Sequence, residues 1–316
     1  MATTKKVTHE TLIMKIVIAC VVLCLGGTVF SPSYRLRAVS VQDKILRIKQ
    51  DDDAQTICIY RDKDEPILTQ NVPEDARAYL HPIVAPDGKG LITEYRPSHH
   101  RHQTGIFWGL KLVNGRDYFM KWQSDYYRRV STNVIQKTGS KVQWESVYDM
   151  LDEKGNVVIT ETQNWSMQQP AGKYVLDLKW SGQAKTDVTI SKYYVGGLFV
   201  RMPWHSGIPA EAVNAVGQRN SDAEAQRAIW TDVGMQVDGR DDMAHVAIFD
   251  HPDNDGFPTG WRVDNQFGIG PSRQIMGDWS IEKGKTQVFR YRLIIYTGTL
   301  DPVEMTRAWK AFVKQY

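Results

Sequence analysis

The chain has 316 residues, 42% of them hydrophobic, and a formal net charge of +3, which is an ordinary composition for a globular protein. This length allows one large β domain or two domains of common size. No run of basic residues is longer than two, so the charge pattern excludes a nucleic-acid-binding surface of the usual basic kind.

Residues 1–31 are predicted to be a signal peptide or an N-terminal anchor. Three lysines precede the apolar stretch 16–30. Such a stretch is short for a membrane span and typical of the apolar part of a signal peptide. We expect export to the periplasm or the extracellular space after cleavage near Ser31. The alternative is an uncleaved N-terminal anchor, through which alone the protein would contact the membrane.

The remaining chain has a single cysteine, Cys58, because Cys20 and Cys24 fall in the predicted signal peptide. A disulfide within one mature chain is therefore excluded. Cys58 lies in a strand-like run, so we expect a small core residue. Removing residues 1–31 also leaves a nearly neutral protein, which favours a neutral substrate over a charged polymer.

Short strand-like runs separated by turn residues fill the chain from about residue 36 to residue 300. Segments 142–151 and 157–162 read as a hairpin with a glycine-containing loop. Segment 285–297 alternates apolar and basic residues and predicts a long, half-buried strand. We therefore predict an all-β fold, a single large antiparallel β-sandwich domain over residues 32–316.

One helix is predicted at the C-terminus. Asp301 is a good N-cap, Pro302 suits the first helical position, and Glu304 completes a pattern like a capping box. Four apolar residues then share one face, which is expected to pack on a sheet: Met305, Trp309, Phe312 and Val313. The long polar segment 206–228 is predicted to be an irregular, functional loop.

The sequence HHRHQTGIFWGL, residues 99–110, is the first candidate site. In an extended segment, His100 and His102 point to the same face, where two imidazoles can hold a metal or handle protons. The strand 106–108 would anchor them. A polar surface loop after Pro97 is the alternative.

Two further segments supply candidate binding residues. Arg201, within an apolar strand, needs either a substrate oxygen or a carboxylate such as Asp232. Asp232 itself is expected at a turn. Trp204 offers a ring face to a sugar, and His205 follows it. Glu94, before the histidines, is the best single acid.

The segment AIFDHPDN predicts a strand that ends in polar residues. Asp250, His251 and Asn254 stand where loops commonly build sites. We expect Asp250 and Asn254 to bind hydroxyl groups and His251 to face His100 and His102 across one pocket. Motifs for a phosphate loop, a serine nucleophile elbow or a zincin helix are absent from the sequence, and Cys58 has no neighbouring histidine.

Five segments together resemble the PmoA-like family, exported bacterial proteins often labelled methane oxygenase. The five segments are HHRHQTGIFWGL, GGLFVRMP, AIFDHPDN, the following Trp261, and FRYRLIIYTG. The family's histidine segment reads His-Pro-His-His-Arg. His99, His100 and Arg101 match its core, while Arg96 stands where the leading histidine would be. His102 is the candidate to replace that histidine.

This resemblance implies a sandwich similar to galactose mutarotase, a mutarotase-like supersandwich, and a role in carbohydrate use. In such sites histidines and a carboxylate on a concave sheet handle the protons of sugar oxygens. A methane-oxidising role conflicts with the sequence, which has one short apolar segment instead of several membrane spans.

The leading hypothesis is an exported sugar-active enzyme, an epimerase, lyase or hydrolase, that uses His100, His102 and His251 as acids and bases. Its partner would be a small carbohydrate or glycoside, without nucleic acid. In the first alternative, the same three histidines bind a divalent metal cofactor, which is zinc, iron or manganese. The second alternative is a non-catalytic carbohydrate-binding protein.

Overall fold

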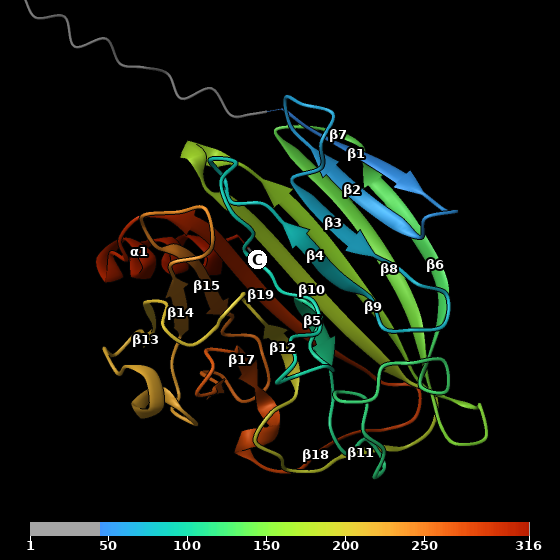
Figure 1. Ribbon diagram of the computed structural model, residues 1–316. Helices are drawn as coiled ribbons and strands as arrows, with labels where there is room; N and C mark the ends of the chain where they lie inside the picture. Colours follow the sequence, from blue (N-terminus) through green and yellow to red (C-terminus); the bar gives the residue numbers. More distant parts are fainter. Residues whose placement is uncertain (1–44, 316) are drawn as a thin grey trace, which may run out of the picture. The chain divides into compact units, whose positions relative to one another are not determined.

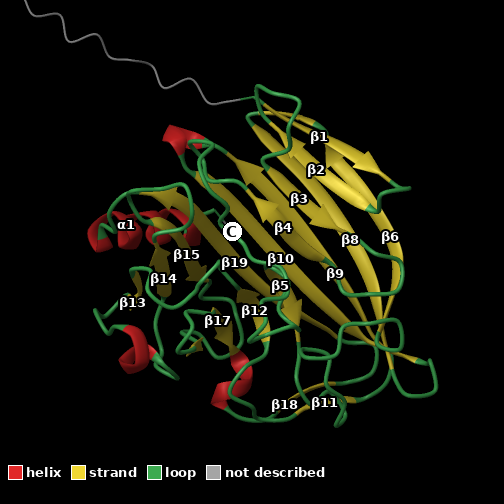
Figure 2. Ribbon diagram, viewed as in Figure 1, coloured by secondary structure: helices red, strands yellow, loops and turns green. Residues whose placement is uncertain are grey.

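Two large antiparallel sheets pack face to face in the computed structural model, which describes residues 45–315 (Figure 1). The nine-stranded sheet has the order β16-β17-β12-β5-β4-β3-β2-β1-β7. The eight-stranded sheet has the order β13-β14-β15-β19-β10-β9-β8-β6. A small sheet pairs β11 with β18. The predicted all-β antiparallel sandwich is confirmed, and strands dominate the described chain (Figure 2).

The strands of the nine-stranded sheet are β1 Leu46–Asp51, β2 Thr56–Tyr60, β3 Leu68–Asn71, β4 Tyr79–Ile83, β5 Ile106–Gly109, β7 Thr138–Gly139, β12 Gly197–Val200, β16 Gly260–Val263 and β17 Ile269–Ser272. The strands of the eight-stranded sheet are β6 Tyr127–Gln136, β8 Lys141–Leu151, β9 Val157–Gln168, β10 Tyr174–Ala184, β13 Ala210–Asn214, β14 Trp230–Met235, β15 Ala244–Asp250 and β19 Thr286–Thr297. The small sheet contains β11 Val188–Ile190 and β18 Trp279–Ile281. Short 3-10 helices cover Pro170–Gly172, Asn220–Ala223 and Arg273–Met276. The hairpin β8–β9 and the long strand β19 confirm the sequence predictions.

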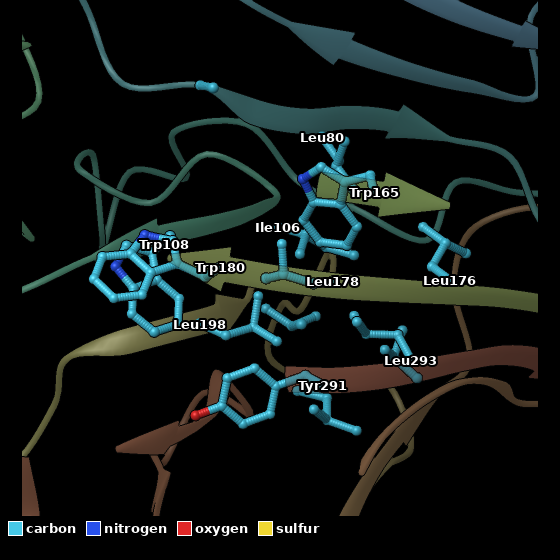
Figure 3. Packing of buried hydrophobic residues seen from close by; sticks show 14 of the residues in the cluster. Leu80, Ile106, Trp108, Trp165, Leu176, Leu178, Trp180, Leu198, Tyr291 and Leu293 are labelled. Carbon is cyan, nitrogen blue, oxygen red and sulfur yellow. The ribbon is translucent and has the colours of Figure 1, made fainter. Parts of the chain in front are cut away.

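The core lies between the two sheets. Trp108 of β5 stacks on Trp180 of β10 with ring centroids 4.3 Å apart, and Leu178 and Leu198 lie beside this pair (Figure 3). Alternation along each strand explains the layer, because every second side chain faces inward. Cys58 is on the other face of β2 and is half-buried, so its predicted core position was wrong.

The C-terminal helix α1, Pro302–Val313, begins as predicted. The Asp301 carboxylate accepts hydrogen bonds from the backbone N–H groups of Val303 (2.9 Å) and Glu304 (3.1 Å). Glu304 pairs with Lys173, which directly precedes β10, at 2.5 Å. Apolar residues of β14, β15 and β19 form a second cluster with Met305 and Phe312, so α1 covers the outer face of the eight-stranded sheet.

The prediction for segment 206–228 needs correction, and the prediction for residues 1–31 lies outside the described residues. Segment 206–228 is not an irregular loop, because it contains β13, which pairs with β14 at the sheet edge, and a 3-10 helix. The predicted signal peptide or anchor, residues 1–31, lies outside the described residues and stays a prediction. Between residues 45 and 315, no helix is both long and apolar enough to cross a bilayer.

Candidate active site

The histidine segment forms two consecutive turns just before β5. The His100 N–H donates to the Pro97 carbonyl, and the Gln103 N–H donates to the His100 carbonyl, both at 2.9 Å. The expected extended geometry was therefore wrong, and the turn after Pro97 is what the structure has. The turns still gather His100 and His102, and they add His99, which the sequence analysis did not assign a role.

The three imidazole rings are close neighbours. Nδ1 of His99 lies 2.8 Å from Nδ1 of His100, a hydrogen-bonding distance. The ring centroids of His100 and His102 are 5.6 Å apart, and the His102 ring lies 5.8 Å from that of Phe119. The histidines thus form a continuous row that ends against an aromatic wall.

These rings line a cavity of about 320 Å³, which is called the histidine cavity below. This volume suits a small ligand, since ligand pockets start at about 300 Å³. Its lining residues are His99, His100, Arg101, His102, Gln103, Lys111, Phe119, Met120, Tyr194, Val195, Phe199, Arg262 and Asp264.

Arg77 supports two walls of the histidine cavity from beneath. Its guanidinium donates to the carbonyl of His102 at 2.9 Å and to that of Phe119 at 2.8 Å. It also lies over the Phe107 ring, 3.7 Å from the centroid, and is almost fully buried. Sequence reasoning missed Arg77, because a lone arginine before a strand carries no signal of what it will hold.

All three imidazoles favour the neutral form. Burial, followed by the charge of Arg201, lowers the pKa of His99 and of His100. Burial and then the neighbouring His100 lower the pKa of His102 to about 4. At neutral pH each ring therefore keeps one bare nitrogen that can accept a proton.

Two of the three lysine and arginine side chains that line the histidine cavity are already paired. Lys111 bonds Asp117 at 2.5 Å, and Arg262 bonds Glu224 at 2.6 Å. Because each charge has its counterion within the protein, neither cation requires an anionic ligand. Arg101, at the exposed rim, has no such ion pair among the described residues.

Arg201 is a structural clamp, which corrects the expectation that it binds substrate. All three guanidinium nitrogens are engaged: Nε with Gln103 at 2.5 Å, Nη1 with the Gln266 carbonyl, and Nη2 with Asp264 at 2.6 Å. The side chain is fully buried. Its carboxylate partner is therefore Asp264 and not Asp232.

The structure does not bring His251 to the histidine cavity. Its ring lies 5.1 Å from that of Phe312, under helix α1, and it does not line the cavity. This corrects the expected three-histidine pocket. The physical reason is topological, since His251 ends β15 in the eight-stranded sheet, while the other histidines precede β5 in the nine-stranded sheet.

Asp250 and Asn254 are internal, which corrects their assignment to substrate binding. The Asp250 carboxylate accepts from the Asn254 amide at 2.7 Å and from the Thr259 N–H at 2.8 Å. Asn254 also bonds both backbone groups of Arg290. Burial raises the pKa of Asp250 to about 7. These bonds fix the loop that follows β15.

The other predicted residues lie near the histidine cavity without lining it. The Trp204 ring is 5.8 Å from that of His99. His205 is exposed, 3.9 Å from Asp238. Glu94 is half-buried beside the backbone of Arg201, and burial raises the pKa of its carboxyl. A role for Glu94 in the chemistry stays a prediction.

A metal held by His100, His102 and His251 is not supported by the geometry. Within residues 45–315, no group of three or more His, Cys, Asp or Glu side chains is arranged to hold a metal ion. The reason is the separation of His251 from the other two rings. The arrangement that the structure does provide is a row of three neutral imidazoles, which suits proton transfer.

A second histidine centre was also missed. His245 of β15 bonds Asp232 of β14 at 2.8 Å, and the Tyr296 hydroxyl donates to the same carboxylate at 3.0 Å. Asp232 therefore lies in a buried strand and not at the expected turn. The signal available was one polar residue in each of two apolar strands, because a polar group buried in such a strand needs a partner.

The chain belongs to a family described as a family of unknown function (DUF6807), which it matches over residues 50–310. No curated protein matches it. The resemblance to the PmoA-like family stays a prediction.

Similar solved structures include the GH36 α-galactosidase AgaB from Geobacillus stearothermophilus, with 7% identity and a TM-score of 0.39 over 79% of this chain and 41% of that one. Another is a galactose mutarotase related enzyme from Lactobacillus acidophilus, with 8% identity and a TM-score of 0.36 over 82% of this chain and 98% of that one. The chain thus spans about two fifths of the α-galactosidase that it resembles.

Proposed function

We propose that this protein is a carbohydrate-active enzyme that moves protons on a neutral sugar, with the histidine cavity as its active site. The observation that carries the proposal is the 2.8 Å contact between the Nδ1 atoms of His99 and His100 in the cavity wall. Two neutral imidazoles in this contact fix each other's protons.

A hydrogen bond between two Nδ1 atoms needs one proton. One ring therefore carries its proton on Nδ1 and has a bare Nε2, while the other ring carries its proton on Nε2. His100 is the ring between His99 and His102 and is more buried than His99, so we assign the bare Nε2 to it. A fixed tautomer of this kind is what a general base requires.

In the proposed reaction, Nε2 of His100 takes a proton from a sugar hydroxyl. The Nδ1–H of the resulting imidazolium continues to donate to His99, which stabilises the added charge. His102 is placed to hydrogen-bond a neighbouring sugar oxygen. In anomer exchange the proton returns to the ring oxygen as the bond between that oxygen and the anomeric carbon breaks, which gives the open-chain aldehyde. The ring then closes on the other face of the aldehyde by the reverse proton transfers. The net reaction is an isomerisation that consumes nothing else.

The lining supports a neutral polyhydroxy ligand. Two of the cations in the wall, Lys111 and Arg262, are already paired. Aromatic rings of Phe119, Phe199 and Tyr194 offer apolar faces to C–H groups, beside the hydrogen-bonding imidazoles. This mixture of ring faces and uncharged donors and acceptors matches a sugar better than a phosphate or another strong anion.

Hydrolysis is less well supported than isomerisation. Glycosidases commonly use two carboxyl groups that flank the bond. The histidine cavity has one carboxylate in its wall, Asp264, which is occupied by Arg201 and by backbone N–H groups of its own turn. The imidazole row is therefore the better candidate for the chemistry.

Proton transfer is testable by exchange NMR between the anomers of a panel of aldoses, with added protein in D2O. We expect faster anomer exchange. His100→Asn, which keeps a hydrogen-bonding group at the Nδ1 position, should lower the catalysed rate by roughly 10²–10⁴-fold. Deuterium appearing on carbon would identify C–H abstraction, and hence epimerisation at carbon. The exposed His205→Ala is the matched histidine control.

Two results would overturn this proposal. Sugar binding without exchange or deuterium incorporation across the panel would identify a carbohydrate-binding protein. An unchanged rate in folded His100→Asn would remove His100 from the chemistry.

A further inference from the structure

A second cavity shares a wall with the histidine cavity. It has a volume of about 590 Å³. Its lining residues are Asn220, Ser221, Glu224, Arg262, Val263, Asp264, Asn265 and Phe267. Arg262 and Asp264 line both cavities, so the two are adjacent. The second one is called the Phe267 cavity below.

The backbone of Phe267 is held in an unfavourable conformation. Its φ is +60°, in the left-handed region that bulky residues rarely adopt. The Asp264 carboxylate holds this turn by accepting from the N–H groups of Gln266 and Gly268, both at 2.9 Å. Such strain is concentrated at binding sites, where it places a side chain that the backbone alone would not place there.

The same turn is fastened to the histidine loop. Arg201 bonds Gln103 beside His102, and its other nitrogens bond Asp264 and the Gln266 carbonyl. One buried guanidinium therefore sets the position of the Phe267 turn relative to the imidazole row. A rigid link of this kind is needed where one ligand must contact both cavities.

The chemistry of the Phe267 cavity suits a sugar ring. Phe267 supplies a partly buried aromatic face, and Asn220, Ser221 and Asn265 supply amide and hydroxyl groups at the exposed rim. The Arg262 charge is paired with Glu224 at 2.6 Å, as in the histidine cavity. Uncharged donors and acceptors around an aromatic ring bind hydroxyl groups and C–H faces together.

We propose that the Phe267 cavity is a second subsite and that the substrate is a neutral oligosaccharide with its reducing end in the histidine cavity. The placement of the reducing end rests on the proposed function, because anomer exchange requires a free anomeric hydroxyl at the imidazoles. The second sugar unit stacks on Phe267 and bonds the polar rim. The cavities together accommodate at least a disaccharide.

Binding of glucose and galactose is to be compared with that of cellobiose, maltose and lactose by titration calorimetry. We expect at least one disaccharide to bind about tenfold more tightly than its monosaccharides, as one added ring contact provides. Phe267→Gly should abolish this advantage and leave monosaccharide affinity unchanged. Glycine adopts the positive φ freely, so the turn is retained. Phe267→Tyr keeps a ring and should keep the advantage.

Equal affinities for monosaccharides and disaccharides in the wild-type protein would overturn the second subsite. An equal loss of affinity for monosaccharides and disaccharides in Phe267→Gly would also overturn the second subsite. The exposed Asn265→Ala provides a second variant with little risk to folding and should weaken disaccharide binding selectively. These measurements need no turnover, so a failure of anomer exchange with the binding pattern intact would contradict the proposed function alone.

Discussion

The protein uses histidine in two opposite ways. In the histidine cavity, burial and nearby cations lower the imidazole pKa values, and the partner of one imidazole is another imidazole. In the eight-stranded sheet, His245 faces only acceptors, the Asp232 carboxylate at 2.8 Å and the Gly298 carbonyl at 3.1 Å. Two acceptors match two N–H groups, so this geometry stabilises the imidazolium form of His245.

The comparison shows that burial alone does not decide the charge of a histidine. Burial lowers the pKa of His245 as well, but the hydrogen bond and charge of Asp232 outweigh it and raise the pKa. The cavity histidines lack a carboxylate of this kind at bonding distance among the described residues. A neutral imidazole can exchange protons with a ligand. An imidazolium that donates two hydrogen bonds, as at His245, instead stabilises the packing of β14 and β15.

The largest effect is expected from Asp232→Asn. Removing one partner of a buried ion pair leaves an uncompensated charge, so the free energy of unfolding should fall by about 3–5 kcal/mol. Chemical denaturation measures this loss. Asp253→Asn is the control, because Asp253 lies 3.7 Å from His251 and is largely exposed. A similar loss of unfolding free energy in both variants would show that the buried pair of Asp232 and His245 contributes no more than an exposed carboxylate near a histidine.

Gly234→Ala should destabilise the protein by about 1–3 kcal/mol through overpacking. Gly234 of β14 is paired with His245 of β15, and a Cβ at this glycine would lie 2.3 Å from Cε1 of the imidazole. A double-mutant cycle with His245→Ala gives the coupling. The cost of the added methyl group should largely vanish in that background, and a persisting cost would show that the ring is not what the glycine accommodates.

The pH dependence of stability should have opposite signs at the two sites. The raised pKa of His245 means that its contribution is complete below about pH 6.5, the unfolded value, and is lost as pH rises through the folded pKa. The lowered pKa of His102 means that stability falls as pH drops from about 6.5 to about 4.

Difference curves between the wild-type protein and each variant isolate these contributions from those of other groups. His245→Gln should flatten the curve above about pH 6.5, and His102→Gln should flatten it below that pH. Thermal unfolding between pH 4 and pH 9 provides the data. The prediction would be contradicted if His245→Gln flattened the stability curve below about pH 6.5 and His102→Gln flattened it above that pH.

The smallest effect is expected from His205→Ala. His205 is exposed and lies 3.9 Å from the fully exposed side chain of Asp238, so unfolding free energy should change by less than about 0.5 kcal/mol. Anomer exchange should be unchanged. A marked loss of exchange would move the active site toward His205 and away from the histidine cavity.

Local patterns in the sequence predicted much of the fold. The alternation in 285–297, the turn within 142–162 and the cap at Asp301 all correspond to observed elements. These features depend on near neighbours in the chain, which is why they are readable there. Segment 206–228 was misread because a five-residue edge strand carries too short an alternation to recognise.

The candidate site was predictable only in part. The histidine segment was identified, since three imidazoles within four positions stay close whether the backbone turns or extends. The spacing between His251 and His100, the partner of Arg201 and the role of Arg77 were not predictable. Each depends on segments that become neighbours in space although 25 or more residues separate them in the chain.

The sequence by itself therefore determined the class of fold, the C-terminal helix and one cluster of chemistry-bearing residues. Only the tertiary structure decided which polar residues meet a ligand and which hold the scaffold. The physical reason is that a buried polar group must find a partner, and that partner is supplied by strand pairing and sheet packing. Partners within the protein satisfy the buried side chains of Asp250, Arg201 and Asp232. The imidazoles of His99, His100 and His102 instead line a cavity.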